Sequence, residues 1–213
     1  MRVDDCPMSK LATTIECIPA DADAGGVPSA HPAGDLAIWF FILAELLAFA
    51  VFFAAYAFAR AQDVALFNAM QAHVDRNLGA LNTLFLVTGS WCVARAVRAV
   101  EVHGRQAQGA RWLALAIACG GGFLVVKCFE YAAKFGAGIT LSTNTFWMFY
   151  LSLTFFHMMH VILGMVILVV LWFQTRRGTY GPGRANGLES GAAYWHMVDL
   201  VWIILFPLVY VMR

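Results

Sequence analysis

The residues that could carry chemistry are ionisable side chains inside apolar stretches of the sequence. Glu45 lies in WFFILAELLAF, Lys127 and Glu130 lie in KCFEYAAKF, and His157 and His160 lie in FFHMMHVILG. Residues three positions apart face nearly the same side of a helix. The spacing of the two histidines is therefore that of a metal-binding pair, and equally that of two side chains that hydrogen-bond to neighbouring helices.

A further pair at this spacing, His196 and Asp199, lies in YWHMVDLVW. The whole set brings carboxylates and histidines from four apolar stretches, which approaches the ligand inventory of a di-iron bundle. Such bundles take a Glu-x-x-His motif from each of two helices, whereas Thr154 and Ala193 stand three residues before His157 and His196. Six histidines, three of them outside the apolar stretches, are also too few for the histidine boxes of membrane hydroxylases and desaturases. We therefore predict no metal site, and a stand-alone di-metal membrane oxidoreductase is the alternative.

Ionisable groups inside a membrane are costly unless they are paired, hydrated or turned toward the interior of a bundle. We expect Lys127 and Glu130 to interact on one helix face. No basic residue is near Glu45 in the sequence, so we expect its carboxyl group to be protonated unless another helix supplies a cation. The residues expected to form inter-helical hydrogen bonds are Glu45, Glu130, His157, His160, His196 and Asp199. A proton path or a bound lipid head group is the alternative use of these groups.

Membrane-spanning helices must position these residues. The 213 residues are 61% hydrophobic and 13% charged, with a mean hydropathy of +0.70, whereas soluble domains are about 25% charged. Stretches long enough to cross about 30 Å of hydrocarbon lie at roughly 36–59, 78–97, 112–133, 146–173 and 193–212. The sequence predicts an all-α polytopic membrane protein, a bundle of five transmembrane helices in one domain at 35–213, after a flexible cytoplasmic tail at 1–34.

The basic residues indicate the orientation of the chain. Nine of the 14 Lys and Arg fall on one side of the predicted bundle: Arg2, Lys10, Arg95, Arg98, Arg105, Arg111, Arg176, Arg177 and Arg184. By the positive-inside rule these segments are cytoplasmic. The N-terminus is then cytoplasmic and the C-terminus periplasmic. The net charge of +1 gives no reason to expect nucleic acid as a partner.

Several segments, in order, resemble subunit III of the haem-copper respiratory oxidases. GDLAIWFFILAELLAFAVFFAAYAF is similar to the family helix with an intramembrane glutamate, which matches Glu45. LNTLFLVTGS resembles the start of the next helix, FEYAAKF a glutamate-tyrosine motif, and FFHMMHVILG a Phe-His-x-x-His-Val-x-x-Gly motif. AYWHMVDLVWIILFPLVYVMR resembles the closing Trp-His-x-x-Asp-x-Val-Trp helix. The resemblance covers about 34–213.

The resemblance implies a non-catalytic subunit of a bacterial inner membrane complex. Such a subunit has no redox cofactor of its own; haem and copper, or non-haem iron, belong to the partner, catalytic subunit I. It binds phospholipid in a cleft and supports assembly, proton uptake and turnover stability. By resemblance, His157 and His160 are structural, and Glu45 and Glu130 are the conspicuous buried carboxylates.

The resemblance leaves the type of complex open. Five spans are similar to the quinol-oxidase version and to accessory proteins of nitric oxide reductase of the NorE type, whereas seven are usual in cytochrome c oxidase. Lys127 and Lys134 make the chain look closer to the NorE type. Oxygen or nitric oxide as substrate, and cytochrome c or quinol as electron donor, both remain open.

Overall fold

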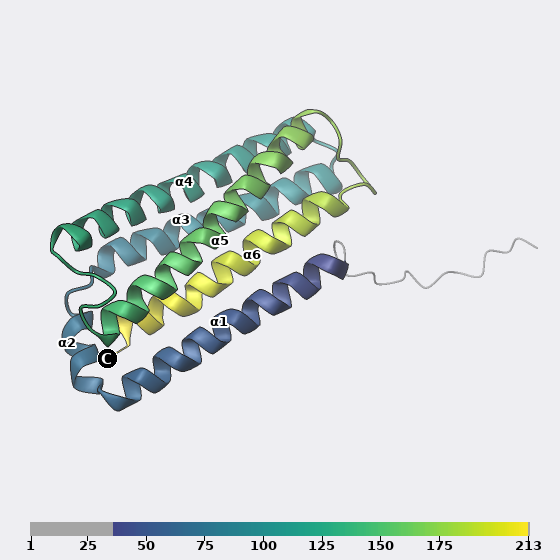
Figure 1. Ribbon diagram of the computed structural model, residues 1–213. Helices are drawn as coiled ribbons and strands as arrows, with labels where there is room; N and C mark the ends of the chain where they lie inside the picture. Colours follow the sequence, from purple (N-terminus) through teal and green to yellow (C-terminus); the bar gives the residue numbers. More distant parts are fainter. Residues whose placement is uncertain (1–35, 213) are drawn as a thin grey trace, which may run out of the picture. The chain divides into compact units, whose positions relative to one another are not determined.

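Five long helices make up most of the part of the chain that the structure describes (Figure 1). The computed structural model describes residues 36–212, and the predicted tail at 1–34 lies outside them. The long helices are α1 (Leu36–Gln62), α3 (Arg76–Glu101), α4 (Gln106–Gly136), α5 (Thr145–Arg176) and α6 (Asn186–Phe206). All five are long and apolar enough to cross a membrane, with α6 continued to Val211, and residues 36–212 contain no β-strand. The all-α class and the number of spans are therefore confirmed. Helices α3, α4 and α5 extend beyond both predicted ends, α1 extends beyond its predicted C-terminal end, and α6 begins earlier than predicted.

A short helix, α2 (Val64–Gln71), was not predicted. It begins where the Asp63 side chain accepts a hydrogen bond from Leu66 N at 3.0 Å, a common N-terminal cap. Its eight residues mix polar and apolar types and are too few to cross a bilayer. The helix nevertheless packs into the bundle, because Phe67 and Gln71 are buried.

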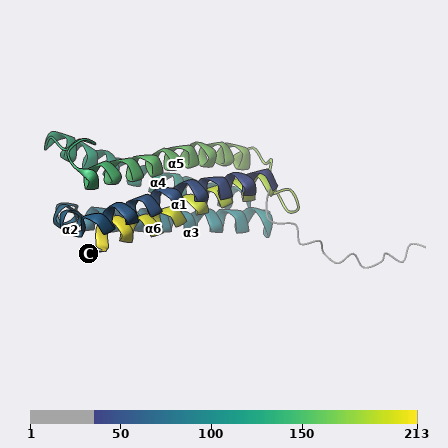
Figure 2. The ribbon, with the colours of Figure 1, turned by 60° about the horizontal axis from the view of Figure 1, so that its bottom comes forward.

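The long helices run roughly parallel or antiparallel to one another, as Figures 1 and 2 show from two directions. In the most apolar segment of α6, 56% of residues are buried, against 11% in that of α1. Helix α6 therefore lies in the interior of the bundle, and α1 lies at its edge. Hydrophobicity does not drive helices together in lipid, so specific packing and polar contacts between α6 and its neighbours must hold the bundle together.

Helix α6 ends in a π-helical turn, η1 (Pro207–Val211). Proline cannot donate a backbone hydrogen bond, and here Met212 N donates to the Pro207 carbonyl, five residues back, at 2.9 Å. Helix α2 stabilises this π-helical turn, because Gln71 Nε2 donates a hydrogen bond to the Val209 carbonyl at 2.8 Å. Arg60, at the end of α1, donates to the Met212 carbonyl at 2.6 Å. The turn thus has a fixed position relative to α1 and α2.

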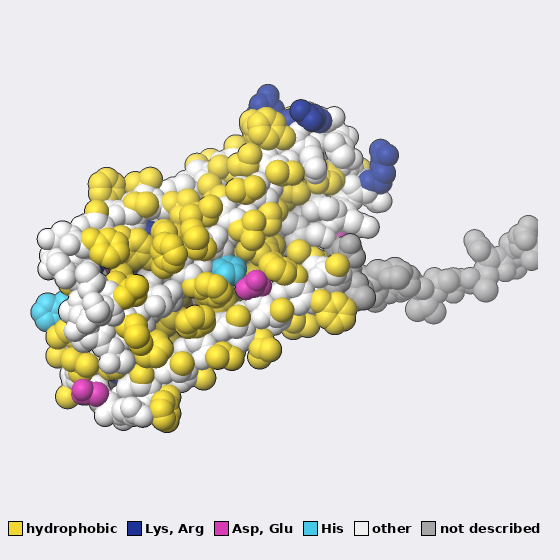
Figure 3. All heavy atoms as spheres, in the orientation of Figure 1, with side chains coloured by type: hydrophobic (Ala, Val, Ile, Leu, Met, Phe, Trp, Pro, Cys, Tyr) yellow, Lys and Arg dark blue, Asp and Glu magenta, His cyan; other side chains and the backbone are white. Residues whose placement is uncertain are grey.

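The two basic connections meet at one end of the molecule. Gln106, at the start of α4, donates to the Tyr180 carbonyl in the connection between α5 and α6 at 2.8 Å. Burial raises the pKa of the Tyr180 hydroxyl, which donates to Gln174. Figure 3 shows Lys and Arg side chains gathered at this end, beyond a side surface that is largely apolar. Basic side chains thus gather at one end of the bundle, as the predicted orientation requires. The orientation itself stays a prediction.

Candidate functional site

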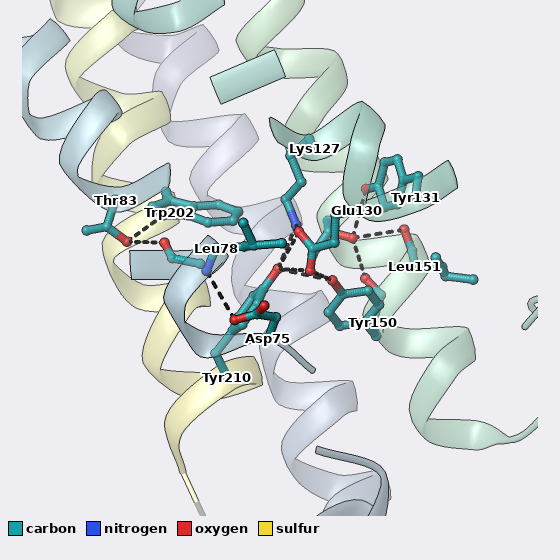
Figure 4. Close-up of polar contacts among 12 residues, drawn as sticks. Asp75, Leu78, Thr83, Lys127, Glu130, Tyr131, Tyr150, Leu151, Trp202 and Tyr210 are labelled. Carbon is teal, nitrogen blue, oxygen red and sulfur yellow. Dashed lines mark hydrogen bonds and ion pairs between the residues drawn. The ribbon is translucent and has the colours of Figure 1, made fainter. Parts of the chain in front are cut away.

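The main candidate site is a buried polar cluster of Lys127 and Glu130 on α4, Tyr150 on α5 and Tyr210 on η1 (Figure 4). Lys127 Nζ lies 2.9 Å from Glu130 Oε2, and the two side chains are 0% and 2% exposed. The predicted interaction of these residues on one helix face is therefore confirmed. A lysine and a glutamate one turn apart neutralise each other where no solvent reaches them.

The two tyrosines complete the hydrogen bonding of this ion pair. Tyr210 accepts from Lys127 Nζ at 2.6 Å and donates to Glu130 Oε1 at 3.1 Å. The Tyr150 hydroxyl donates to the same carboxylate oxygen. Buried charges are tolerated when their remaining donors and acceptors are satisfied in this way. The cluster is therefore an inter-helical tie that joins α4, α5 and η1.

Aromatic rings surround the lysine ammonium group. Its Nζ lies 5.2 Å from the ring centroid of Trp202 and 5.6 Å from that of Tyr131. Contacts of this length between a cation and an aromatic face are attractive. Trp202 in turn donates through Nε1 to Thr83 on α3 at 3.0 Å, and Figure 4 shows this contact beside the cluster. The cluster is thereby connected to α3 and α6 as well.

A glycine on α3 allows the π-helical turn to approach. A Cβ added at Gly79 would lie 2.8 Å from a ring carbon of Phe206 and 2.9 Å from one of Tyr210. Contacts this short are repulsive, so a larger residue at position 79 would displace the aromatic rings. Gly79 therefore helps to position the Tyr210 hydroxyl.

A second polar site joins α1 to α5 through Glu45 and His160. Glu45 Oε2 lies 2.9 Å from His160 Nε2, and the two side chains are 22% and 10% exposed. The other ring nitrogen, Nδ1, lies 2.8 Å from the Phe156 carbonyl, which can only accept a hydrogen bond. Nδ1 therefore carries a proton, and the contact with Glu45 needs a second one, either on the carboxyl group or on Nε2. In both arrangements the pair as a whole is neutral. The expected inter-helical bond of these residues is confirmed.

A third site lies between α3 and α6. The Ser90 hydroxyl forms a short hydrogen bond with His196 Nδ1, which confirms the inter-helical bond expected of this histidine. Asp199 Oδ2 lies 3.9 Å from the same nitrogen, too far for a hydrogen bond. Within residues 36–212, the contact of Asp199 is thus with its own helix, and the prediction of an inter-helical bond is wrong for this residue.

His157 also departs from the prediction. Its side chain is 0% exposed, and neither ring nitrogen has a hydrogen-bond partner among residues 36–212. It packs instead against aromatic rings, with centroid distances of 5.1 Å to Trp202 and 5.8 Å to Phe123. Three residues correspond to about 300° of helix rotation, so His157 and His160 point about 60° apart. That difference directs one ring into the aromatic core and the other toward α1.

The ionisable residues that the sequence singles out are therefore divided among separate sites. Three sites hold polar pairs, and His157 stands apart from all of them. In the described part of the chain, no three His, Cys, Asp or Glu side chains are grouped as metal ligands would be. The sequence did not predict the roles of Tyr150, Tyr210 and Ser90. Their residue types give no signal of their own, because each acts through a helix distant in the sequence.

The comparisons with known proteins agree with the motifs. A sequence model described as cytochrome c oxidase subunit III matches residues 32–213. The cytochrome c oxidase subunit 3 of Thermostichus vulcanus is 31% identical over 202 residues, which cover 92% of this chain and 96% of that protein. The corresponding subunit of Synechocystis sp. is 32% identical, covering 81% and 72%. The probable subunit of Rickettsia conorii is 34% identical, covering 80% of this chain and 64% of the relative. With its five spanning helices and the match over all of them, this chain belongs to the cytochrome c oxidase subunit III family.

Proposed function

We propose that this chain is the non-catalytic subunit III of a haem-copper respiratory complex in a bacterial inner membrane. The observation that carries the proposal is the similarity to the Thermostichus vulcanus subunit over 96% of that protein's length. The chain packs against catalytic subunit I, which holds the haem and copper, or non-haem iron, of the complex. Its own contribution is to assembly and to stability during turnover.

The arrangement of the polar residues supports a structural role. The buried polar cluster joins α4, α5 and η1, and the pair of Glu45 and His160 joins α1 and α5. Each of these sites satisfies its charges with partners from the same chain. The stand-alone di-metal oxidoreductase would need the carboxylates and histidines to converge, and the described residues place them in separate sites.

Proton uptake and lipid binding belong to the same proposal. At Glu45 and His160, proton uptake is the alternative to the structural tie, because this pair can hold its shared proton on either residue. A cavity of about 550 Å³ between α4 and α5 is lined mostly by apolar side chains, including Phe135, Leu151 and Phe155. A cavity of this kind on the side of a spanning bundle suits the acyl chain of a phospholipid.

Two observations bear on the gas that the complex reduces. Lys127 and Lys134 favour the NorE type, an accessory protein of nitric oxide reductase. The near-complete match to a subunit named for cytochrome c oxidase supports the oxidase type. We therefore propose oxygen as the substrate of the complex and keep nitric oxide as the second candidate.

The experiment is a comparison of gas consumption by the complex that co-purifies with the tagged chain. In mild detergent, the material should consume oxygen with reduced cytochrome c or quinol. Deletion of the chain should leave haem in the complex but shorten its active lifetime during turnover. Consumption of nitric oxide alone would favour the second candidate, and a lifetime unchanged by the deletion would contradict the proposed role.

A further inference from the structure

A basic pocket lies at the turn between α3 and α4. It has a volume of about 260 Å³ and is lined by Arg95, Arg98, Ala99, His103, Arg105, Gln108 and Trp112. No acidic side chain is among these residues. Three guanidinium groups and an imidazole therefore line one small concave space at the end of the bundle where basic side chains gather.

The arginines of the basic pocket are not neutralised from within the described chain. The ion pairs formed between residues 36–212 involve other residues, so no carboxylate of this range lies within 4.0 Å of a nitrogen of Arg95, Arg98 or Arg105. Unpaired arginines facing one space attract an anion, and their planar guanidinium groups suit a phosphate. The charge of the pocket thus defines the ligand as an anion.

Aromatic contacts hold one side of the pocket in place. The guanidinium carbon of Arg95 lies 5.6 Å from the ring centroid of Trp91 and 5.3 Å from that of Trp112. The two indole rings pack edge to face, with centroids 5.2 Å apart. Tryptophans of this kind are typical of the membrane interface, where the polar head groups of lipids lie.

An apolar strip leads from the pocket toward the middle of the membrane. On α3 it comprises Trp91, one turn before Arg95, and Val87, two turns before it. The side chains of Trp91 and Val87 are 54% and 45% exposed. On α4 it comprises Leu115, which follows Trp112 and is 51% exposed. A soluble anion would contact the pocket only, whereas a lipid would place its head group in the pocket and its acyl chains along this strip.

We propose that the basic pocket binds the phosphate of an anionic phospholipid, of the chemical class of phosphatidylglycerol. A zwitterionic lipid fits less well, because its ammonium group would enter a space lined by positive charge. The inference goes beyond the lipid binding proposed above, because the basic pocket lies at the start of α4, whereas the cavity lined by Phe135 lies at the other end of that helix. Its test does not depend on oxidase activity, so it can fail while the proposed function stands.

The test compares lipid adducts of the full-length protein by native mass spectrometry. The protein is released from micelles that contain equal amounts of phosphatidylglycerol and phosphatidylcholine, and the ratio of the two single-lipid adducts is measured. The pocket variant is R98Q/R105Q, which keeps Arg95 between its tryptophans. The matched control, R177Q/R184Q, removes the same charge at the same end of the bundle from residues that do not line the pocket.

The wild-type protein should prefer phosphatidylglycerol, and the pocket variant should lose this preference by about fivefold for each arginine removed. The control should keep it within about twofold, since diffuse surface attraction is weak and screened by salt. R98K/R105K keeps the charge and should retain part of the preference. Equal loss in R98Q/R105Q and R177Q/R184Q, or no loss in either, would overturn the proposal. So would displacement of the lipid by inorganic phosphate at matched ionic strength, because the occupant would then be a soluble anion.

Discussion

Replacing Glu130 with glutamine should strongly destabilise the protein, because it leaves a charge without a partner inside the membrane. Glutamine has nearly the same shape but no negative charge, and its one carbonyl oxygen can replace only one of the two carboxylate oxygens, which accept from Lys127 and from the two tyrosines. The lysine side chain is 0% exposed, so water does not solvate it. Tyr210 and at most the one amide oxygen would remain to accept hydrogen bonds from Nζ, and no anion would offset its charge.

The size of the effect follows from this burial. Removing one partner of a buried ion pair costs about 3–5 kcal/mol. Lys127→Met should cost less, about 1–3 kcal/mol, because Glu130 keeps its two tyrosine donors and can become neutral by binding a proton. The double variant K127M/E130Q removes both charges and should be more stable than E130Q alone by at least about 2 kcal/mol. The two substitutions are therefore expected to be non-additive.

The assay is unfolding of the purified chain in mixed micelles as the fraction of denaturing detergent rises, followed by circular dichroism. The four proteins of the cycle are wild type, E130Q, K127M and the double variant. A silent E130Q together with a harmful K127M would refute the reasoning. Additive losses in the double variant would also refute it, since the two charges would then not stabilise each other.

Three further substitutions test other parts of the structure. Glu45→Gln keeps a hydrogen bond to His160 without the titrating carboxyl group, so assembly and the pH profile of turnover should be unchanged, and a shifted pH profile would instead reveal a proton-responsive role. Gly79→Ala adds a Cβ only 2.8 Å from a ring carbon and should lower the free energy of unfolding by about 1–3 kcal/mol. The control is Gly121→Ala, whose added Cβ would have no atom within 4 Å. Equal effects of the two substitutions would argue against the close contact at Gly79. His157→Phe should change the free energy of unfolding by less than about 1.5 kcal/mol, because the ring has no hydrogen bond to lose among residues 36–212, and a larger loss in the same unfolding assay would point to a polar partner.

The parts of the fold that were predictable depend on local pattern. Long apolar stretches predict the membrane-spanning helices, and the spacing of Lys127 and Glu130 predicts their contact. Both features are properties of single helices. Helix α2 was missed because eight mixed residues form a helix only when packed against the bundle. Its position could not be read from composition alone.

The polar partners were less predictable, because they depend on how distant segments meet. Tyr210 reaches Lys127 across 83 positions of sequence through the turn that follows Pro207. His157 and His160 share a sequence motif, yet the angle between them on α5 places one against Trp202 and the other against α1. Spacing identifies residues that could interact, and packing decides which of them do.

The most direct test of the proposed function is to measure haem and metal in the tagged chain, first in mild detergent and then after separation from its partners. We expect the complex to contain haem with copper or non-haem iron. All of it should stay with the partner polypeptide, and the isolated chain should remain folded with substoichiometric metal. Stoichiometric iron, copper or zinc in the isolated chain would contradict the account, and so would purification of the intact chain with no haem-containing partner.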